Sequence, residues 1–490
     1  MLLELMTIAM LNPNTDKLAL NTLSEKKQVV QQASDKNYQF KVIMPEKNKT
    51  KYTNFVQVVD NYSEIAKKTI IEFNDRYKQD GQFLKWVTLP ELQLEKKLGK
   101  SQLDKIYEQA NTLSSRKTTV NRPLVVLGIG GSKHTAEFLL NMTGFDRKRQ
   151  IYFYSDIDPI SYKNFMEQTG LEIQHLNFLV VSKSGTTFET SDAFRRFEND
   201  LIKYYQTEGL DTEKAITKAQ QHFAICTDAS PSEKNLRGKI GSKNGTDNGY
   251  LKELYIHDDV GGRYSMFDDA GLFVLAYAGV KEDIATRILN GAIEANNKNL
   301  STKSIHRNPA IQGAIFNIFA RDNKYTLIQH QYFGKLFDGA GENWAKQLYL
   351  ESLKDFDYVV GKAPDSMHYA TEGHFSPQNR SKYNTIMTIM NPEISDNYKK
   401  YTSAIAETYA ETTPVKIEIL EVENNAIKPE AIGEYIQTKH FETVYMGILR
   451  RMNSAGYIEL DKLPEILQPS VETYKNKFKP DSPYELSPGK

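Results

Sequence analysis

Short apolar runs alternate with longer amphipathic segments through the middle of the chain. Residues Leu124–Leu127 form the first run, which glycines stop, and Ala136, Leu139 and Leu140 then recur at helical spacing. The same alternation passes through further apolar runs at 150–154, 178–181, 223–226 and 254–256. Strands that alternate with helices in this way predict a parallel sheet that is covered by helices on both faces.

A second and weaker unit of the same kind follows, with candidate strands at 325–328, 358–360, 385–390 and 415–422. Residues 1–118 are polar and rich in lysine, with helical spacing of the apolar residues in places. A chain of 490 residues also exceeds what one hydrophobic core usually organises. We therefore predict an α/β protein with two doubly wound parallel-sheet domains, at 119–285 and 286–455. A helical N-terminal arm at 1–118 and a C-terminal helix and tail at 456–490 complete this division.

The charged residues balance, because lysine and arginine total 62 and aspartate and glutamate also total 62. No net field then attracts nucleic acid or a membrane surface, and an anionic ligand must be held by local geometry. The single cysteine, Cys226, allows no disulfide framework and fits a reducing compartment. No apolar run is long enough for a transmembrane helix, and the start at 1–11 lacks a basic region and a clear cleavage site. We expect a cytoplasmic protein.

A glycine-rich turn, Gly128-Ile129-Gly130-Gly131-Ser132-Lys133, follows the first apolar run and opens the predicted helix. Free backbone N–H groups and the helix dipole form an anion site at such a turn, and Ser132 is placed to cap the helix. The Rossmann and P-loop patterns would both need glycine at position 133, so the dinucleotide and nucleoside triphosphate interpretations lose support. A tight turn with a serine cap and no ligand is the alternative.

A second loop of the same kind, Ser182-Lys183-Ser184-Gly185-Thr186-Thr187, ends another predicted strand and opens an amphipathic helix. Its four hydroxyls, at Ser182, Ser184, Thr186 and Thr187, can each donate a hydrogen bond to a phosphate oxygen. A helix cap alone would need only one hydroxyl. Two such loops at the carboxyl ends of strands define one crevice in an open α/β sheet, so we predict a phosphate site there.

The two loops resemble those of the sugar isomerase (SIS) domain, which grip sugar phosphates, and the predicted domains are then of SIS type. Two further segments narrow the resemblance to the glucose-6-phosphate isomerase (phosphoglucose isomerase) family. Residues 259–265, Asp-Val-Gly-Gly-Arg-Tyr-Ser, are close to the first pattern of that family. Residues 467–475, Leu-Gln-Pro-Ser-Val-Glu-Thr-Tyr-Lys, resemble the second.

The second segment departs from the family pattern at two positions. The family has aspartate where this chain has Leu467 and glycine where it has Ser470, whereas Gln468 and Lys475 keep their expected spacing. The resemblance spans roughly residues 60–480 in order and spacing. It implies a reversible isomerisation of glucose 6-phosphate and fructose 6-phosphate, without a metal or an organic cofactor, in a homodimer.

This isomerisation moves a proton between C2 and C1 through an enediolate after the sugar ring has opened, so it needs a base, a cation and an acid/base pair. Glu351 is our candidate base, since Trp344, Leu348 and Glu351 share one helical face and the family has its glutamate in a similar Gln-Leu…Glu-Ser-Leu context. An ordinary helical glutamate, paired with Lys354, is the alternative.

Arg263 is the candidate cation, because a turn between glycines and a tyrosine can direct its permanent charge into the crevice. A surface ion pair with Asp258 or Asp259 is the alternative. For ring opening, the resemblance implies a histidine and a lysine, which we match to His368 and Lys475.

A second histidine near His368 in the sequence could also be the one that opens the ring. Bacterial members of the family have serine and glutamine where this chain has Tyr369 and Glu372, and His374 lies close enough to His368 to be confused with it.

The histidines form no H-x-H or H-x-x-x-H pair, so no ligand set for a histidine-based metal site is visible. Two other functions remain open. Another SIS-domain enzyme would lack the arginine, glutamate and lysine set, and a non-catalytic phosphosugar sensor would carry a basic helix-turn-helix at its N-terminus, which is not evident here.

Overall fold

The computed structural model describes most of the chain between residues 29 and 455. None of the helices in this part combines the length and the apolar character needed to cross a bilayer. The described residues are 29–34, 37–45, 52, 54–115, 122–144, 146–183, 185, 187–229, 236, 249–325, 327–337, 339–353, 357–363, 383–390, 395–424 and 426–455.

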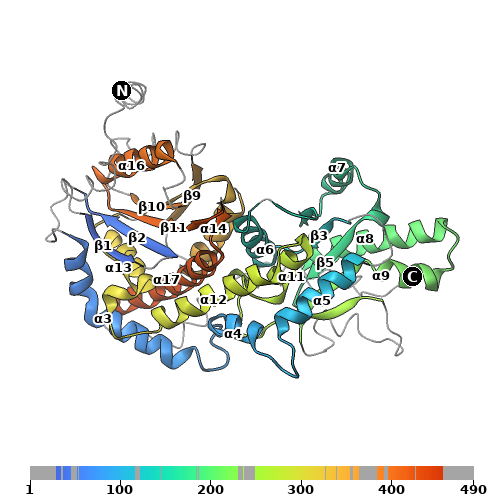
Figure 1. The fold of residues 1–490 in the computed structure, drawn as a ribbon, viewed down its shortest axis with the longest axis horizontal. Helices are drawn as coiled ribbons and strands as arrows, with labels where there is room; N and C mark the ends of the chain where they lie inside the picture. The colour runs from blue at the N-terminus through green and yellow to red at the C-terminus, as the bar shows by residue number, and fades with distance from the viewer. Residues whose placement is uncertain are drawn as a thin grey trace.

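Two sheets organise the molecule, and each is built around parallel strands (Figure 1). The smaller sheet has the order β4-β3-β5-β6-β7, and all its pairs are parallel. Its strands are β3 (Leu124–Leu127), β4 (Ile151–Tyr154), β5 (Asn177–Val181), β6 (Phe223–Asp228) and β7 (Leu251–Ile256). Each contains one of the apolar runs of the first unit, so the parallel-sheet prediction is confirmed here.

Both faces of the smaller sheet are covered, which explains why its inner strand β3 is apolar at every position. Leu124 and Val126 of β3 belong to one core, and Val125 and Leu127 belong to another on the opposite face. The first core includes residues of α5 (Gln102–Ser115), α6 (Gly131–Met142) and α11 (Asp269–Ala278). The second includes residues of α7 (Pro159–Thr169), α8 (Phe188–Thr207) and α9 (Thr212–Gln220).

The larger sheet has the order β1-β2-β11-β10-β8-β9. Strands β8 (Leu327–Phe333), β9 (Asp357–Ala363), β10 (Tyr383–Met390) and β11 (Val415–Leu420) run parallel, as the second weaker alternation predicts. Strands β1 (Val29–Ser34) and β2 (Tyr38–Ile43) add an antiparallel edge. The N-terminal segment is therefore helical only in part, because these two strands pair into a sheet whose other strands come almost 300 residues or more later.

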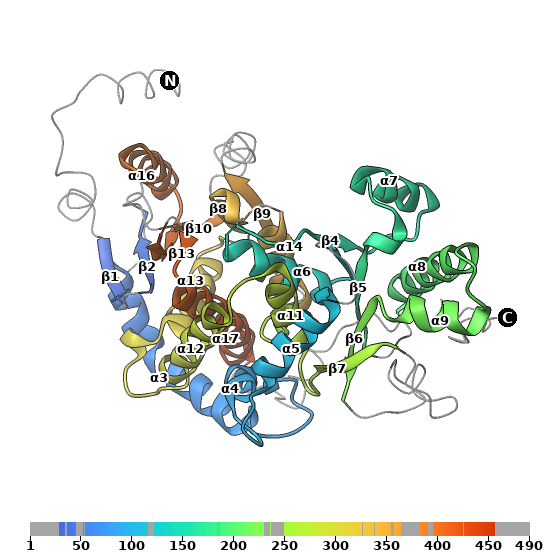
Figure 2. The same ribbon diagram turned by 45° about the vertical axis from the view of Figure 1, so that its right-hand side comes forward.

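Helices between the sheets join them into one continuous core, as the turned view shows (Figure 2). The 27 residues of α17 (Pro429–Ala455) form the long helix behind the larger sheet, and α12 (Glu282–Asn299) packs along it. Further helices around this core are α3 (Phe55–Arg76), α4 (Leu89–Leu94), α13 (Pro309–Asp322) and α14 (Ala340–Leu353). Helix α16 (Asp396–Ala410) covers the outer face of the larger sheet.

A ring of four buried charges lies between the larger sheet and α17. Lys416 Nζ of β11 lies 2.8 Å from carboxylate oxygens of both Glu418 and Glu442, and Lys439 Nζ of α17 lies 2.9 Å and 3.1 Å from the same two carboxylates. Burial alone raises the pKa of Glu418, but the charges of Lys416 and Lys439 outweigh it and hold this pKa below its ordinary value. Tyr349 of α14 donates to Glu442 at 3.1 Å, so the ring also anchors α14.

Substitution of Glu442 by glutamine tests how strongly the fold depends on this ring. The variant leaves two buried lysines with one carboxylate, and breaking a buried ion pair typically costs about 3–5 kcal/mol. We expect the free energy of unfolding, measured by denaturant titration, to fall by that amount. Glu64→Gln on α3 is the matched control, because the Glu64 side chain is 86% exposed. Equal stability of the two variants would contradict the role assigned to the ring.

Candidate active site

The two predicted phosphate loops lie side by side, because β3 and β5 are neighbours and Leu127 pairs with Val180 near the carboxyl ends of both strands. Strand β4 lies on the other side of β3, so the chain changes direction across the sheet between these loops. In open α/β sheets ligands bind at such a switch point. The structure thus brings together the two loops that the sequence singled out.

The first loop makes a tight turn into α6. Gly130 is the residue before the helix and has φ 54°, a backbone conformation that favours glycine. The expected cap by Ser132 is wrong, because the helix begins at Gly131 and no side chain accepts a hydrogen bond from its first turn. Ser132 lies inside the helix, one residue beyond its start, where a side chain no longer serves as the cap.

The second loop closes on itself before α8 begins. The Ser182 hydroxyl accepts a hydrogen bond from the backbone N–H of Gly185 at 3.1 Å, and the Ser191 hydroxyl donates to the Gly185 carbonyl at 2.9 Å. Thr187 is the N-cap residue of α8, but its side chain accepts no hydrogen bond from that helix. Lys183 pairs with Asp258 at 2.7 Å, and Ser184 and Thr186 lie outside the described residues.

Helix α6 touches the backbone of the short helix η3 (Gly262–Tyr264) with no side chain between them. A Cβ atom on Gly131 would lie 2.1 Å from the carbonyl carbon of Gly262 and 2.7 Å from the amide nitrogen of Arg263. Only glycine fits at position 131 without moving one of the two segments. This contact places the start of the first loop's helix directly against the residue that carries the candidate cation.

Arg263 is buried, with 1% of its side chain exposed. Its Nε donates to the Ser352 hydroxyl at 2.7 Å, and its Nη1 lies 3.1 Å from a carboxylate oxygen of Glu351. The Tyr264 and Ser352 hydroxyls lie 2.8 Å apart and fix the same end of the guanidinium. The structure rejects the surface ion pair with Asp258 or Asp259, since the carboxylate that pairs with Arg263 belongs to Glu351.

Glu351 lies on α14, where Trp344 and Leu348 are fully buried on the same face. The Trp344 indole N–H donates to the carbonyl of Arg263 at 3.2 Å, which ties α14 to η3. The Glu351 side chain keeps 36% exposure, so its carboxylate contacts both Arg263 and the solvent-accessible side of the helix. The predicted helical face is therefore correct, and burial of the carboxylate is partial.

Gln347 was missed as a site residue from the sequence. It lies one helical turn before Glu351 and donates to that carboxylate at 3.2 Å, and its Nε2 would lie 3.0 Å from a Cβ on Gly130. The side chain thus bridges the first loop and the candidate base. Its spacing of four residues from Glu351 on one helical face was the available signal. The predicted residues His368, Gln468 and Lys475, and the competitor His374, lie outside the described residues.

Comparison with known proteins bears on the family of the chain. Residues 100–332, which include both loops and Arg263, match the family model described as phosphoglucose isomerase. This part of the chain belongs to the phosphoglucose isomerase family. A glucose-6-phosphate isomerase of Caldanaerobacter subterraneus is 28% identical over 355 residues, which cover 69% of this chain and 70% of the relative. That of Mesoplasma florum is 26% identical and covers 81% and 89%.

Solved structures show that the fold is shared well beyond the level of sequence similarity. A glucose-6-phosphate isomerase from Chlamydia trachomatis aligns with a TM-score of 0.64 at 15% identity, over 96% of this chain and 93% of that one. A hypothetical protein from Thermus thermophilus aligns with a TM-score of 0.68 at 19% identity, over 86% and 96%. The arrangement of both sheets is therefore that of the phosphoglucose isomerase fold.

A pair of glycine substitutions tests the contact between α6 and η3. In Gly131→Ala the new methyl group collides with the Gly262 carbonyl, whereas in Gly262→Ala the nearest atom, the Gly131 Cα, lies at an ordinary 3.6 Å. A displacement of about 1 Å in an active site can cost about 100-fold in rate. We expect kcat/KM to fall by that factor in Gly131→Ala, and Gly262→Ala to retain most of its activity. Similar losses in two equally well-folded variants would contradict the contact.

Proposed function

We infer that this chain interconverts glucose 6-phosphate and fructose 6-phosphate. The observation that carries this inference is the buried Arg263 in contact with Glu351, beside the turn that opens α6. A permanent cation and a carboxylate at one point are what proton transfer through an enediolate needs. The family and its glucose-6-phosphate isomerase relatives supply the substrate pair.

We propose that the phosphate group lies between the two loops. The start of α6 at Gly131 and Ser132, and the start of α8 at Thr187, offer a positive helix end on neighbouring strands. Ser182, Ser184, Thr186 and Thr187 provide the hydroxyl donors of the second loop. Lys183 adds a positive charge at the rim, which Asp258 partly offsets.

We propose that Glu351 removes the C2 proton of the open-chain aldose. The electron pair of the C2–H bond then forms the C1–C2 double bond, and the C1 carbonyl oxygen becomes the enediolate oxygen. Arg263 stabilises that negative charge. The hydroxyl proton at O2 passes to O1, and Glu351 returns its proton to C1, which gives the ketose. Gln347 orients the Glu351 carboxylate and supports the sugar from the first loop.

Ring opening is assigned to residues that the structure does not describe. We propose His368 and Lys475 as its acid/base pair and Gln468 as a substrate contact, because these positions match the family pattern. On the same resemblance we propose a cytoplasmic homodimer in which the histidine reaches the neighbouring subunit's site. Light scattering of the purified protein measures the oligomeric state, and a mass of one chain would contradict the dimer.

A coupled assay that converts fructose 6-phosphate to glucose 6-phosphate, with and without a chelator, tests the proposed activity. Among the described residues, the group that could share a metal ion is His257, Asp268 and Asp269, and Glu351 is not part of it. We expect equal turnover in both conditions. Absence of turnover by well-folded protein would favour a phosphosugar sensor, and turnover of a different sugar phosphate would favour another SIS-domain isomerase.

The substitution Glu351→Gln tests the base. Glutamine preserves the length of the side chain and much of its hydrogen bonding to Gln347 and Arg263, but it cannot accept the C2 proton. General-base catalysis contributes about 10²–10⁴-fold, so we expect kcat to fall by at least about 100-fold. Binding of an inhibitor that resembles the enediolate should change by about tenfold at most.

The matched control for this substitution is Glu294→Gln on α12, a half-exposed glutamate that pairs only along its own helix with Lys298. Exchange of the substrate's C2 hydrogen with deuterated solvent should disappear in Glu351→Gln and persist in the control. A Glu351→Gln variant that still exchanges deuterium would show that another residue is the base.

A further inference from the structure

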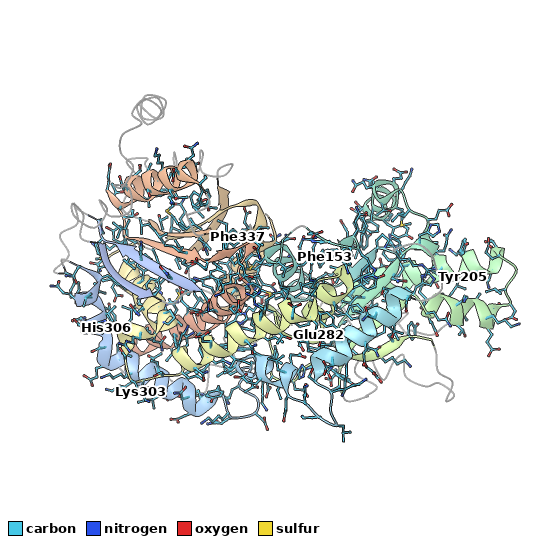
Figure 3. All side chains as sticks on the ribbon, in the orientation of Figure 1. Phe153, Tyr205, Glu282, Lys303, His306 and Phe337 are labelled. Atoms are coloured by element: carbon cyan, nitrogen blue, oxygen red, sulfur yellow. The ribbon has the colours of Figure 1, made fainter. Side chains whose placement is uncertain are left out.

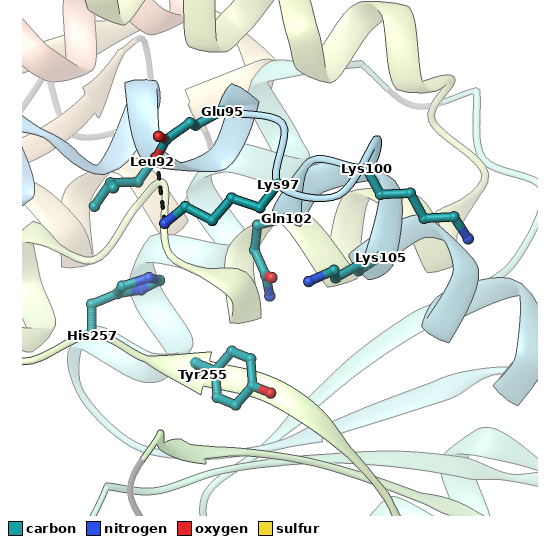
Figure 4. A pocket seen from close by; sticks show the side chains of 8 residues that line it. All are labelled: Leu92, Glu95, Lys97, Lys100, Gln102, Lys105, Tyr255 and His257. Carbon is teal, nitrogen blue, oxygen red and sulfur yellow. Dashed lines mark ion pairs between the residues drawn. The ribbon is translucent and has the colours of Figure 1, made fainter.

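A cavity, which we call the lysine pocket, lies outside the site described above. Its volume is about 120 Å³, which leaves room for several water molecules (Figure 4). It is formed by the turn between α4 and α5, the first helical turn of α5, and the end of β7. The residues that line it are Leu92, Glu95, Lys97, Lys100, Gln102, Lys105, Tyr255 and His257.

The walls of the lysine pocket are fixed by local hydrogen bonds. Lys97 and Lys100 bond to each other's backbone across a tight turn, with N···O distances of 2.8 Å and 3.3 Å. Ser101 caps α5 by accepting from the Asp104 amide at 3.0 Å, and Asp104 accepts from the Ser101 amide at 2.7 Å. Tyr255 of β7 donates its backbone N–H to Asp269 at 2.8 Å.

Positive groups outnumber negative ones in the lysine pocket. Lys97 pairs loosely with Glu95 at 3.5 Å, and Lys100 pairs with Glu108 and extends away from the other side chains (Figure 4). Lys105 makes no ion pair or hydrogen bond with any side chain of the described residues, and its amine points toward Gln102 (Figure 4). Lys97, Lys105 and His257 therefore line the cavity with positive charge, which Glu95 offsets only in part.

His257 carries its charge because of the carboxylates behind it. Its Nδ1 lies 2.6 Å from Asp268, which leaves the opposite ring nitrogen for the cavity. Burial lowers the pKa of His257, but the hydrogen bond and charge of Asp268, with the charges of Asp269 and Asp258, outweigh it and raise this pKa to about 9. The imidazole is then protonated at neutral pH and acts only as a donor.

The cluster of His257, Asp268 and Asp269 is better suited to this ion pair than to a metal ion. Gln93 and Gln102 donate to the two oxygens of Asp269 at 2.9 Å and 2.7 Å, so both oxygens already have donors. Asp268 is engaged by His257 through both the ring and the backbone N–H.

We propose that the lysine pocket binds a small phosphate dianion, either inorganic phosphate or the phosphate group of a small metabolite. Lys97, Lys105, His257 and Gln102 line the cavity, and a dianion accepts hydrogen bonds from ammonium, imidazole and amide donors. The pocket is separate from the phosphate loops, because those loops follow β3 and β5 whereas the pocket lies at the end of the edge strand β7. The proposal is independent of the isomerase activity.

Calorimetric titration of the full chain with inorganic phosphate at low ionic strength tests the proposal. The pocket variant is Lys97→Gln with Lys105→Gln, and Ser182→Ala with Thr187→Ala removes donors from the phosphate loops. We expect two sites per chain in the wild type. The pocket variant should lose at least about tenfold in affinity at one site and keep the other, and the loop variant should show the reverse.

A control variant, Lys68→Gln with Lys163→Gln, removes the same charge from exposed positions on α3 and α7 and should keep both sites. His257→Gln should weaken the same site as the pocket variant. Titration with glycerol 3-phosphate distinguishes inorganic phosphate from a phosphate-bearing metabolite as the ligand. A pocket for a metabolite should bind this ester at least as tightly as it binds inorganic phosphate. The proposal is overturned if the pocket variant binds phosphate with the stoichiometry and affinity of the wild type.

Discussion

The site depends on a contact between two stretches of backbone, at Gly131 and Gly262, where no side chain separates α6 from η3. One stretch begins the helix behind the first phosphate loop, and the other leads directly to Arg263. Because the two backbones touch, the first turn of α6 and the buried guanidinium are held at a fixed separation. Trp344 then ties α14 to the Arg263 carbonyl, which brings Glu351 to the same point. Three elements that are far apart in the sequence meet at this contact.

The buried charges between the larger sheet and α17 also hold α14 in place, through Tyr349 on that helix. Glu442 forms ion pairs with Lys416 and Lys439 and accepts a hydrogen bond from the Tyr349 hydroxyl. Helix α14 is therefore held between the buried ion ring and η3. Apolar side chains of similar size often stabilise a core as well as a buried ion pair does. A ring of alternating charges, however, satisfies its hydrogen bonds in one arrangement only, and it fixes the position of the helix that carries Glu351.

The smaller sheet and the loops that it carries could be predicted from the sequence, because runs such as Leu124–Leu127 are apolar throughout and are followed by glycines or hydroxyls. Strand β2 could not be predicted, since it pairs with β11 more than 370 residues later and lies in a lysine-rich segment. Lys416 and Glu418 resemble the solvent face of a strand in the sequence, and only their partners on α17 make their burial possible. Arg263 and Glu351 were found by family pattern, whereas their contact with each other and the bridge by Gln347 depend on tertiary packing.

A crystal structure of the enzyme with a bound open-chain hexose 6-phosphate analogue is the most direct test of the central claim. The claim is that one ligand spans the phosphate loops and the Arg263–Glu351 pair. We expect phosphate oxygens within hydrogen-bonding distance of Ser182 and Thr187, and the C2 atom about 3–3.5 Å from a Glu351 carboxylate oxygen. A ligand whose phosphate instead contacts Arg263, or whose C2 atom lies away from Glu351, would contradict the account.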